Sequence, residues 1–549
     1  MGTFGSLGSV ESVAYRAQEP MSKTNPRLNG QWPDAGDKTL PTLIWVILVA
    51  LCIGAQPFLL GFYSDDWVDC ATASRVGPPF SAALFRFVSQ INPSRIGYFP
   101  LRYLFSSLFQ DRTYLWQGAM LLGNCLVALT VILLIARLTD GAVTKNKTVA
   151  IWAGLAWLVI PWNDALLFWP TMLPNVLTLA ALGLLVAWLV HGWAQRRHHA
   201  FAAGLIYLWM CLGYEAFYFQ WIPIALIGLA LWRTGRARLR EVVLSATGLF
   251  VAQLCAVLWY MIAPRLGAGG PAGLEHPIVS NWPLIFFGDL LTIIPSMVRS
   301  FGALAPPFAI VAVLLTVIWA VMAYQNAVMR ASLAPAAACL AGGLLSILAF
   351  ALGGRGIQAT GGATRTLQVF NFWLVAAVGV LITALVERTS GARRTAALVV
   401  LGCLGVALAV GHLQRLADWT AAWKLQNEIL AGAPLDALQK TPAHSTILLI
   451  DRPSVNGARI FDSVWDLNAA MPWKYSSLAG RVFFAYNPEN GVLRWDTGLH
   501  GDTGKLRYET GEPYETPSEH LYVWRPAERS FTEARRPFRV VPGVGVENF

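Results

Sequence analysis

Two adjacent carboxylates, Asp65 and Asp66, directly follow the first long apolar run of the chain, in the aromatic stretch 62–67 (FYSDDW). A carboxylate at the headgroup level of a bilayer is partly desolvated, which raises its proton affinity and suits it to act as a general base. The alternative is that the acids end a helix in water and the aromatics form an interface belt. We favour the catalytic interpretation, because acids at membrane depth are usually functional.

Three arginines are candidates for binding an anion near these acids. Arg102 lies in the stretch 99–103, and Arg355 and Arg365 lie in the glycine-rich segment 353–365. A guanidinium group grips phosphate oxygens bidentately and stays charged, and glycines let backbone N–H groups approach an anion closely. The alternative for each arginine is that its side chain reaches out to lipid headgroups.

The apolar run 200–232 contains a lone acid, Glu215, next to Tyr214. An acid in such a position is costly unless it pairs with a base or faces a wet cavity. Glu215 could therefore pair with an arginine or bind a sugar hydroxyl, with Tyr214 beside it as a substrate contact. The alternative is a carboxylate that caps the turn.

Three further residues are candidates for binding substrate. Trp162 and Asp164 are predicted on the same face as Glu215, where the indole could stack on a sugar ring, although an interface belt is the commoner role of such a tryptophan. His276 lies in the segment 264–300, which is rich in glycine and proline. That segment fits a mobile lid and an inert connector equally well.

The elements that position these residues follow from the composition. Of the 549 residues, 55% are hydrophobic and only 13% are charged, about half the charged share of a soluble globular protein. This composition excludes a disordered chain, collagen, a coiled coil and a disulfide scaffold. Six of the seven cysteines lie inside apolar runs, so the spacing predicts neither a metal site nor a disulfide framework.

The apolar runs predict eleven membrane helices, because about 20 apolar residues cross a hydrocarbon core of about 30 Å. The spans are 41–62, 114–136, 148–168, 172–193, 200–214, 216–232, 241–263, 303–325, 332–352, 366–386 and 395–412. The run 200–232 is divided into two short crossings because both of its flanks are strongly basic. A single crossing would place these flanks on opposite sides of the membrane.

The charges predict the orientation. Residues 41–412 carry 22 basic and 11 acidic side chains, and 13 of the basic ones fall in short loops on the same side as the N-terminus. The positive-inside rule makes that side cytoplasmic. Most of the acids of this region then face outward. The basic residues occur in short clusters between apolar runs, which indicates membrane orientation and not nucleic-acid binding.

The chain is predicted to have three parts. Residues 1–40 form a disordered cytoplasmic tail, and residues 41–412 form the transmembrane module. Its first outer loop, 63–113, carries short interfacial helices near 80–88 and 100–109. Residues 413–549 form a small mixed α/β domain on the outer side, with strands near 446–450 and 482–486.

The acidic pair after the first helix, the long first outer loop, the eleven spans and the outer C-terminal domain together resemble the GT-C membrane glycosyltransferases. The resemblance implies that a first-loop carboxylate is essential and that the donor is a sugar on a polyprenyl phosphate. It further implies a glycan or lipid acceptor of the bacterial cell envelope and a place in the bacterial cytoplasmic membrane, with the C-terminal domain periplasmic or extracellular. Some members of the family use a divalent cation such as Mg²⁺ or Mn²⁺, and no other cofactor is implied.

The sequence therefore predicts a membrane glycosyltransferase in which Asp65 or Asp66 takes the proton of an acceptor hydroxyl and the arginines stabilise the leaving phosphate. A transporter or flippase for lipid-linked glycans is the first alternative, and it predicts mid-membrane charges and broken helices related by an internal repeat. A polymerase or ligase of lipid-linked glycans is the second, and it would share the arginines but often lacks the early acidic pair. A purely structural scaffold is the least supported alternative.

Overall fold

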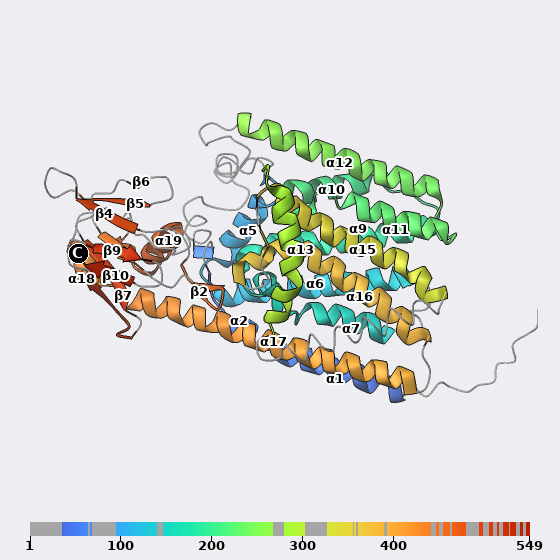
Figure 1. Cartoon of the computed structure of the whole chain (residues 1–549), viewed down its shortest axis with the longest axis horizontal. Coiled ribbons are helices and arrows are strands. Elements are labelled where there is room, and N and C mark those ends of the chain that lie inside the picture. Colours follow the sequence, from blue (N-terminus) through green and yellow to red (C-terminus); the bar gives the residue numbers. More distant parts are fainter. Residues whose placement is uncertain are drawn as a thin grey trace, which may run out of the picture. The chain divides into compact units, whose positions relative to one another are not determined.

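The computed structural model (Figure 1) describes most of the chain up to residue 440 and shorter segments after it. The described residues are 36–63, 66–67, 95–139, 147–266, 279–301, 327–354, 356–357, 361–388, 392–440, 446–449, 454–461, 464–478, 493–497, 504–508, 513–514, 520–525, 527–533, 538–541 and 545–548. The chain divides into two compact units, 1–40 and 41–549, and the description below concerns the second.

Helices make up nearly all of the described chain before residue 440. In chain order they are α1 (Gly36–Gly54), α2 (Gln56–Leu59), α5 (Phe99–Phe109), α6 (Thr113–Thr139), α7 (Lys147–Trp157), η3 (Pro161–Asn163), α8 (Asp164–Phe168), η4 (Pro170–Met172), α9 (Leu173–Ala194), α10 (Ala200–Gly213), η5 (Glu215–Phe217), α11 (Trp221–Arg233), α12 (Leu239–Leu266), α13 (Trp282–Arg299), α15 (Ala327–Leu352), η7 (Gly361–Leu367), α16 (Gln368–Arg388), α17 (Ala392–Ala431) and α18 (Leu435–Lys440).

Nine helices among the described residues are long and apolar enough to cross a membrane. They lie on α1 with α2, α6, η4 with α9, η5 with α11, α12, α13, α15, η7 with α16, and α17. The pair formed by α7 and the η3–α8 segment passes the same test but is bent by 54°, and it makes a tenth span if it is counted as one. The chain is therefore a multi-pass α-helical membrane protein, as the composition predicts.

Most predicted spans coincide with these helices, and three regions need comment. Helix α10, at 14 residues, is shorter than a bilayer core requires. The predicted span 303–325 lies outside the described residues. Conversely, α13 is an apolar helix where the sequence analysis expected a loop, because Asp289 and Pro295 interrupt its apolar pattern. The number of eleven crossings stays a prediction.

The helix bundle is held together by close contacts between helix faces. Helix α6 packs against α7, α9 and α16, and α15 packs against α11 and α16 (Figure 1). Helices α10 and α12 approach each other at two glycines: a Cβ built on Gly204 would lie 3.0 Å from the carbonyl oxygen of Gly248, and one built on Gly248 would collide with the carbonyl of Ala200. Small residues at such crossings are typical of membrane bundles.

Helix α17, the long orange helix in Figure 1, is the one element that leads from the bundle into the C-terminal residues. Its 40 residues span about 60 Å, roughly twice the hydrocarbon core. Its sequence is apolar up to Leu413 and becomes polar from Gln414 onward. This change of composition puts Arg415 near one boundary of the apolar layer.

The described residues after α18 form short strands and two short helices, α19 (Val464–Lys474) and η8 (Ser476–Leu478). Strand β7 (His520–Arg525) pairs in parallel with β1 (Thr446–Leu449) and antiparallel with β8 (Ser530–Glu533). An antiparallel sheet of order β10-β9-β4-β5-β6 joins β4 (Leu493–Thr497), β5 (Gly504–Tyr508), β6 (Pro513–Tyr514), β9 (Phe538–Val541) and β10 (Gly545–Asn548). Strands β2 (Ser454–Val455) and β3 (Ala458–Arg459) form a hairpin.

The sequence analysis located the first of these strands to within one residue, at 446–450, whereas the predicted strand 482–486 lies outside the described residues. The described residues after 440 include both strands and helices, and the small α/β domain stays a prediction. The predicted boundaries of the three parts, 1–40, 41–412 and 413–549, stay predictions.

Candidate functional site

The site is built on a broken stretch of helix, residues 161–172, which comprises η3, α8 and η4 and which we call the broken segment. Prolines at the start of η3 and of η4 interrupt the helical run, because proline cannot donate an N–H bond to the preceding turn. Every residue of the segment is buried. A buried break of this kind needs other partners for its free backbone groups.

Amide side chains of neighbouring helices supply those partners. The Gln56 Nε2 group donates to the carbonyl of Leu167, Gln117 Nε2 donates to the carbonyl of Phe168 at 2.9 Å, and Asn124 Nδ2 donates to that of Leu166 at 2.7 Å. Helices α2 and α6 therefore fix the broken segment in place. An irregular stretch whose carbonyls are bonded to neighbouring helices in this manner is a rigid support for functional side chains.

Asp66 binds the beginning of the first predicted outer loop to this segment. Its Oδ2 accepts the backbone N–H of Tyr63 at 2.8 Å, and its Oδ1 accepts the backbone N–H of Thr171 at 2.7 Å. The residue is only 3% exposed. Both carboxylate oxygens are thus engaged by backbone donors, which is the pattern of an acid that positions a loop.

Two guanidinium groups meet at the indole of Trp169, two residues before Thr171. The Cζ atoms of Arg365, on η7, and of Arg459, on β3, each lie 5.4 Å from the centre of the indole ring. The ring is fully buried, and its Nε1 donates to the carbonyl of Tyr63 at 2.9 Å. The described residues contain no carboxylate that pairs with Arg365.

Arg102 belongs to the same neighbourhood through Tyr98. Its guanidinium carbon lies 5.8 Å from the ring of Tyr98 and 5.9 Å from that of Phe99, and the residue is 9% exposed. The hydroxyl of Tyr98 donates to the carbonyl of Thr171 at 2.8 Å. Helix α5, predicted as an interfacial helix at 100–109, therefore connects Arg102 through Tyr98 to Thr171, the residue whose backbone N–H donates to Asp66.

Glu215 pairs with an arginine, one of the two roles considered for it. Arg95 Nη2 and Glu215 Oε1 are 2.7 Å apart, and both side chains are about one-fifth exposed. The Arg95 guanidinium also lies over the ring of Tyr214, at 5.4 Å. Tyr214 lies 6.4 Å from Tyr98, ring centre to ring centre, which connects this pair to the Arg102 region.

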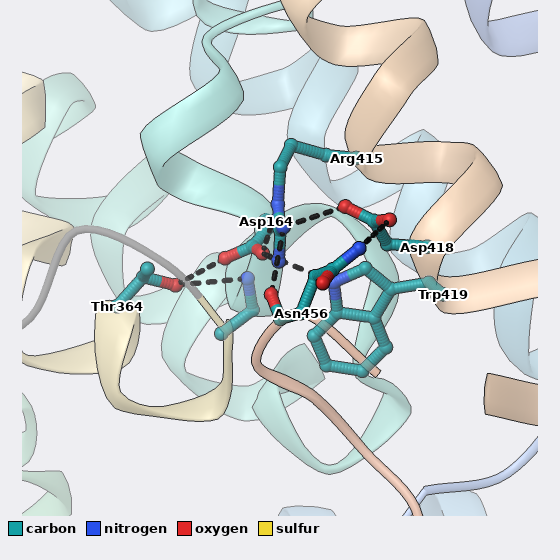
Figure 2. A network of polar contacts seen from close by, with 7 residues as sticks. Asp164, Thr364, Arg415, Asp418, Trp419 and Asn456 are labelled. Carbon is teal, nitrogen blue, oxygen red and sulfur yellow. Dashed lines mark hydrogen bonds and ion pairs between the residues drawn. The ribbon is translucent and has the colours of Figure 1, made fainter. Parts of the chain in front are cut away.

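A second acid, Asp164, lies at the centre of a buried polar network (Figure 2). Its Oδ2 accepts Arg415 Nη2 at 2.7 Å, Arg415 Nε at 3.0 Å and Trp419 Nε1 at 3.0 Å, while its Oδ1 accepts the Thr364 hydroxyl at 2.8 Å. The side chains of Asp164 and Arg415 are 0% and 6% exposed. Each has its charge matched and its hydrogen bonds made, as a buried ion pair requires.

The network continues from Arg415 to the hairpin of β2 and β3. Arg415 Nη1 donates to Asp418 Oδ2 at 2.7 Å and to the carbonyl of Asn456 at 2.8 Å, and Asn456 Nδ2 donates to Asp418 Oδ1 at 2.8 Å (Figure 2). Asn456 and Gly457 have φ angles of +48° and +85°. Two positive φ values define the tight type I′ turn, for which Asn-Gly is the preferred sequence.

Helix α17 also packs against the residues on both sides of Asp66. The hydroxyl of Tyr63 donates to the carbonyl of Trp419 at 2.9 Å, and burial raises the pKa of this tyrosine well above its usual value, so it stays a donor. Gln426 accepts the indole N–H of Trp67 and donates to the carbonyl of Phe62, each at 2.8 Å. A Cβ on Gly61 would collide with the ring of Trp423.

The structure thus brings together Asp66, Arg102, Tyr214, Glu215 and Arg365 around the broken segment. Trp162 belongs to the broken segment itself: it is 7% exposed, its Nε1 donates to Asn371 Oδ1 at 3.0 Å, and its ring contacts Phe301. Substrate binding by Trp162 and by the buried Asp164 stays a prediction. The remaining candidates, Asp65, Arg355 and His276, lie outside the described residues.

Arg415, Asp418 and Trp419 were not among the predicted site residues, because the last membrane helix was predicted to end at 412. The helical spacing of Arg415, Asp418 and Trp419 was the available signal for a longer helix. Arg459 was not among the predicted site residues either; it follows an Asn-Gly pair flanked by short apolar residues, a recognised hairpin signal.

The described residues contain no group of three or more histidine, cysteine, aspartate or glutamate side chains that could hold a metal ion. They do not by themselves form a site for the Mg²⁺ or Mn²⁺ that some GT-C enzymes use. Comparison of the chain with protein-family models gives no match, and comparison with curated proteins gives none either.

Proposed function

We propose that the protein is a membrane glycosyltransferase that moves a sugar from a polyprenyl-phosphate donor to a hydroxyl group of a cell-envelope glycan or lipid, on the non-cytoplasmic face. The observation that carries the proposal is the gathering of Asp66, Arg365 and Arg102 around the broken segment. Arg365 lies over Trp169, whose indole N–H donates to the carbonyl of Tyr63, and the backbone N–H of Tyr63 donates to Asp66. Asp65 adjoins Asp66 in the chain, so we expect a carboxylate in the neighbourhood of these guanidinium groups, as transfer from a phosphate leaving group needs.

The position of the site supports a donor carried by lipid. Arg415, which is linked to the broken segment through Asp164, lies where α17 changes from apolar to polar. The phosphate of a polyprenyl phosphate lies at this depth, with its chain in the hydrocarbon. Arginines at such a boundary can bind the phosphate while their stems remain in the apolar layer.

In the proposed reaction, a carboxylate takes the proton of the acceptor hydroxyl, and the resulting oxygen attacks the anomeric carbon of the donor. The bond between that carbon and the phosphate oxygen breaks, and its electron pair leaves with the polyprenyl phosphate. Arg365, Arg102 and Arg355 stabilise the developing negative charge. Because both oxygens of Asp66 accept backbone N–H groups, we assign the base to Asp65 and a positioning role to Asp66.

A transporter of lipid-linked glycans is the second candidate, and the bent α7–α8 pair with a buried ion pair favours it, since transporters bind substrates at broken helices. However, Asp164 is already bonded to Arg415, Trp419 and Thr364. An acid with these partners has little capacity left for a transported ligand. We therefore favour the transferase over the transporter as the function of the residues around the broken segment.

The test is the release of polyprenyl phosphate by the purified full chain in proteoliposomes, with a panel of polyprenyl-phosphate hexoses and pentoses as donors. We expect at least one donor to be cleaved, and Asp65→Asn to lower the rate by about 10²- to 10⁴-fold. Asp111→Asn, a change at an exposed acid, is the matched control and should leave the rate unchanged. Full activity of Asp65→Asn, or movement of intact donor across the bilayer without cleavage, would contradict the proposal.

A further inference from the structure

We infer that the hairpin of β2 and β3 completes the anion site, with Arg459 and Arg365 together binding the phosphate of an isoprenyl phosphate over Trp169. The inference rests on the proposed function for the identity of the lipid, and it adds a residue from beyond the membrane helices to the site. It thereby gives the residues that follow α17 a role in binding the donor.

The geometry places both guanidinium groups at one ring. Each Cζ atom lies 5.4 Å from the centre of the Trp169 indole, so the two carbons cannot be farther apart than twice that distance. Both side chains are partly exposed, whereas the ring between η7 and β3 is fully buried. A phosphate carries several oxygens, so it can accept N–H groups from two guanidinium groups that lie at one ring.

The hairpin is held rigidly enough to place Arg459. Its turn residue Asn456 is bonded to Arg415 through its carbonyl and to Asp418 through its amide, each at 2.8 Å. On the other side of the turn, Ala458 is fully buried, as are Ile460 and Phe461, the two residues that follow Arg459. A side chain fixed on both sides in this manner loses little freedom when it binds a ligand.

Arginine suits position 459 because its guanidinium group is planar and carries several N–H donors. A guanidinium can lie over an aromatic ring and still direct its N–H groups at phosphate oxygens, which a lysine ammonium cannot do in the same way. A purely structural role is the alternative, in which Arg459 only fastens the hairpin to Trp169. The two roles differ in what their loss changes: ligand affinity in the first, thermal stability alone in the second.

The experiment measures binding of farnesyl phosphate to the purified full chain in detergent micelles by titration calorimetry. Farnesol and inorganic phosphate are the comparison ligands, which separate a lipid-linked phosphate from free phosphate. We expect Arg459→Gln and Arg365→Gln each to weaken farnesyl phosphate binding about 10- to 100-fold. The double variant should lose less than the product of the two effects, because both groups hold one anion.

Arg529→Gln is the matched control, because Arg529 is also an arginine after α17 but its side chain is 72% exposed. This variant should bind farnesyl phosphate with the affinity of the wild type. Arg459→Lys keeps the positive charge and replaces Arg459→Gln in the test if that variant does not fold. We expect Arg459→Lys to bind farnesyl phosphate at least about fivefold more weakly than the wild type. Wild-type affinity in a folded Arg459 variant, with Arg365→Gln impaired, would overturn the inference and leave the proposed function standing. Arg459-dependent binding in a protein that cleaves no sugar donor would support the inference while the proposed function fails.

Discussion

Two buried carboxylates hold the site together at the scale of single residues: Asp164, near the start of the broken segment, and Asp66, which is bonded to Thr171 near its end. Asp66 accepts two backbone N–H groups, and Asp164 accepts a guanidinium, an indole and a hydroxyl. The sequence located both acids, because a carboxylate near an apolar run is conspicuous. Their partners could not be predicted: Thr171 and Arg415 are 105 and 251 residues away from them, and only the folded chain reveals such pairs.

Asp66→Asn should lower the thermal unfolding temperature, because one amide NH₂ would face a backbone N–H in place of an acceptor. We expect a loss of about 1–3 kcal/mol in the free energy of unfolding. Asp65→Asn should leave the unfolding temperature unchanged and lower the transfer rate by about 10²- to 10⁴-fold. Thermal unfolding in detergent, followed by light scattering, measures the first effect. A larger destabilisation by Asp65→Asn than by Asp66→Asn would reverse the two roles.

Asp164→Asn should be more costly, because it leaves the buried guanidinium of Arg415 without its counter-charge. Breaking a buried pair in this manner costs about 3–5 kcal/mol. Trp419→Phe removes one of the hydrogen bonds to Asp164 and should cost only about 1 kcal/mol. The same unfolding measurement compares the two variants. Equal stability of Asp164→Asn and the wild type would show that the network does not hold α17 to α8.

At the scale of elements, α17 and the broken segment organise the site. The sequence predicted α17 only to residue 412, because a hydropathy criterion ends where the apolar side chains end, whereas the helix continues to Ala431. The break at Pro161 and Pro170 was predicted as a continuous span followed by a loop. The amides that stabilise this break are buried polar residues of other helices. A hydropathy average over a whole helix does not identify such single residues or their partners.

Gly97→Ala tests the contact that positions α5. A Cβ at this position would lie 2.8 Å from the carbonyl oxygen of Trp209 and 2.9 Å from the backbone nitrogen of Gly213, and backbone atoms cannot give way. We expect a loss of about 1–3 kcal/mol in stability and weaker farnesyl phosphate binding, because Arg102 follows in α5. Gly118→Ala, within α6 and with nothing within 4 Å of the added carbon, is the matched control and should be neutral or slightly stabilising. Equal effects of the two variants would contradict this account of α5.

At the scale of the whole molecule, the protein class was the property most reliably predicted from the sequence. A chain with 13% charged residues and repeated apolar runs of about 20 residues has few alternatives to a multi-pass membrane protein. The number of crossings was harder to predict, since α13 carries Asp289 and Pro295 in its interior and α10 is short. Such helices are stabilised by their neighbours, and a single-sequence criterion cannot take those neighbours into account.

The proposed orientation predicts that the site and the C-terminal residues lie outside the cytoplasm. A cysteine introduced at Glu528 should react with a membrane-impermeant maleimide in intact cells, and one introduced at Arg197 should react only in inverted vesicles. Both positions are exposed in the structure. The chain without an added cysteine gives the background. Labelling of the Glu528→Cys variant only in inverted vesicles would place the site on the cytoplasmic side and contradict the proposed function.

The central claim is that guanidinium groups at the broken segment bind a lipid-linked phosphate. A cryo-EM reconstruction of the full chain in nanodiscs with a non-hydrolysable isoprenyl phosphonate tests it most directly. The account predicts phosphonate density within hydrogen-bonding distance, about 3 Å, of the Arg365 guanidinium, above Trp169 and with the isoprenyl chain leading into lipid. Phosphonate density at the opposite end of the helix bundle, away from both Arg365 and Asp66, would contradict it.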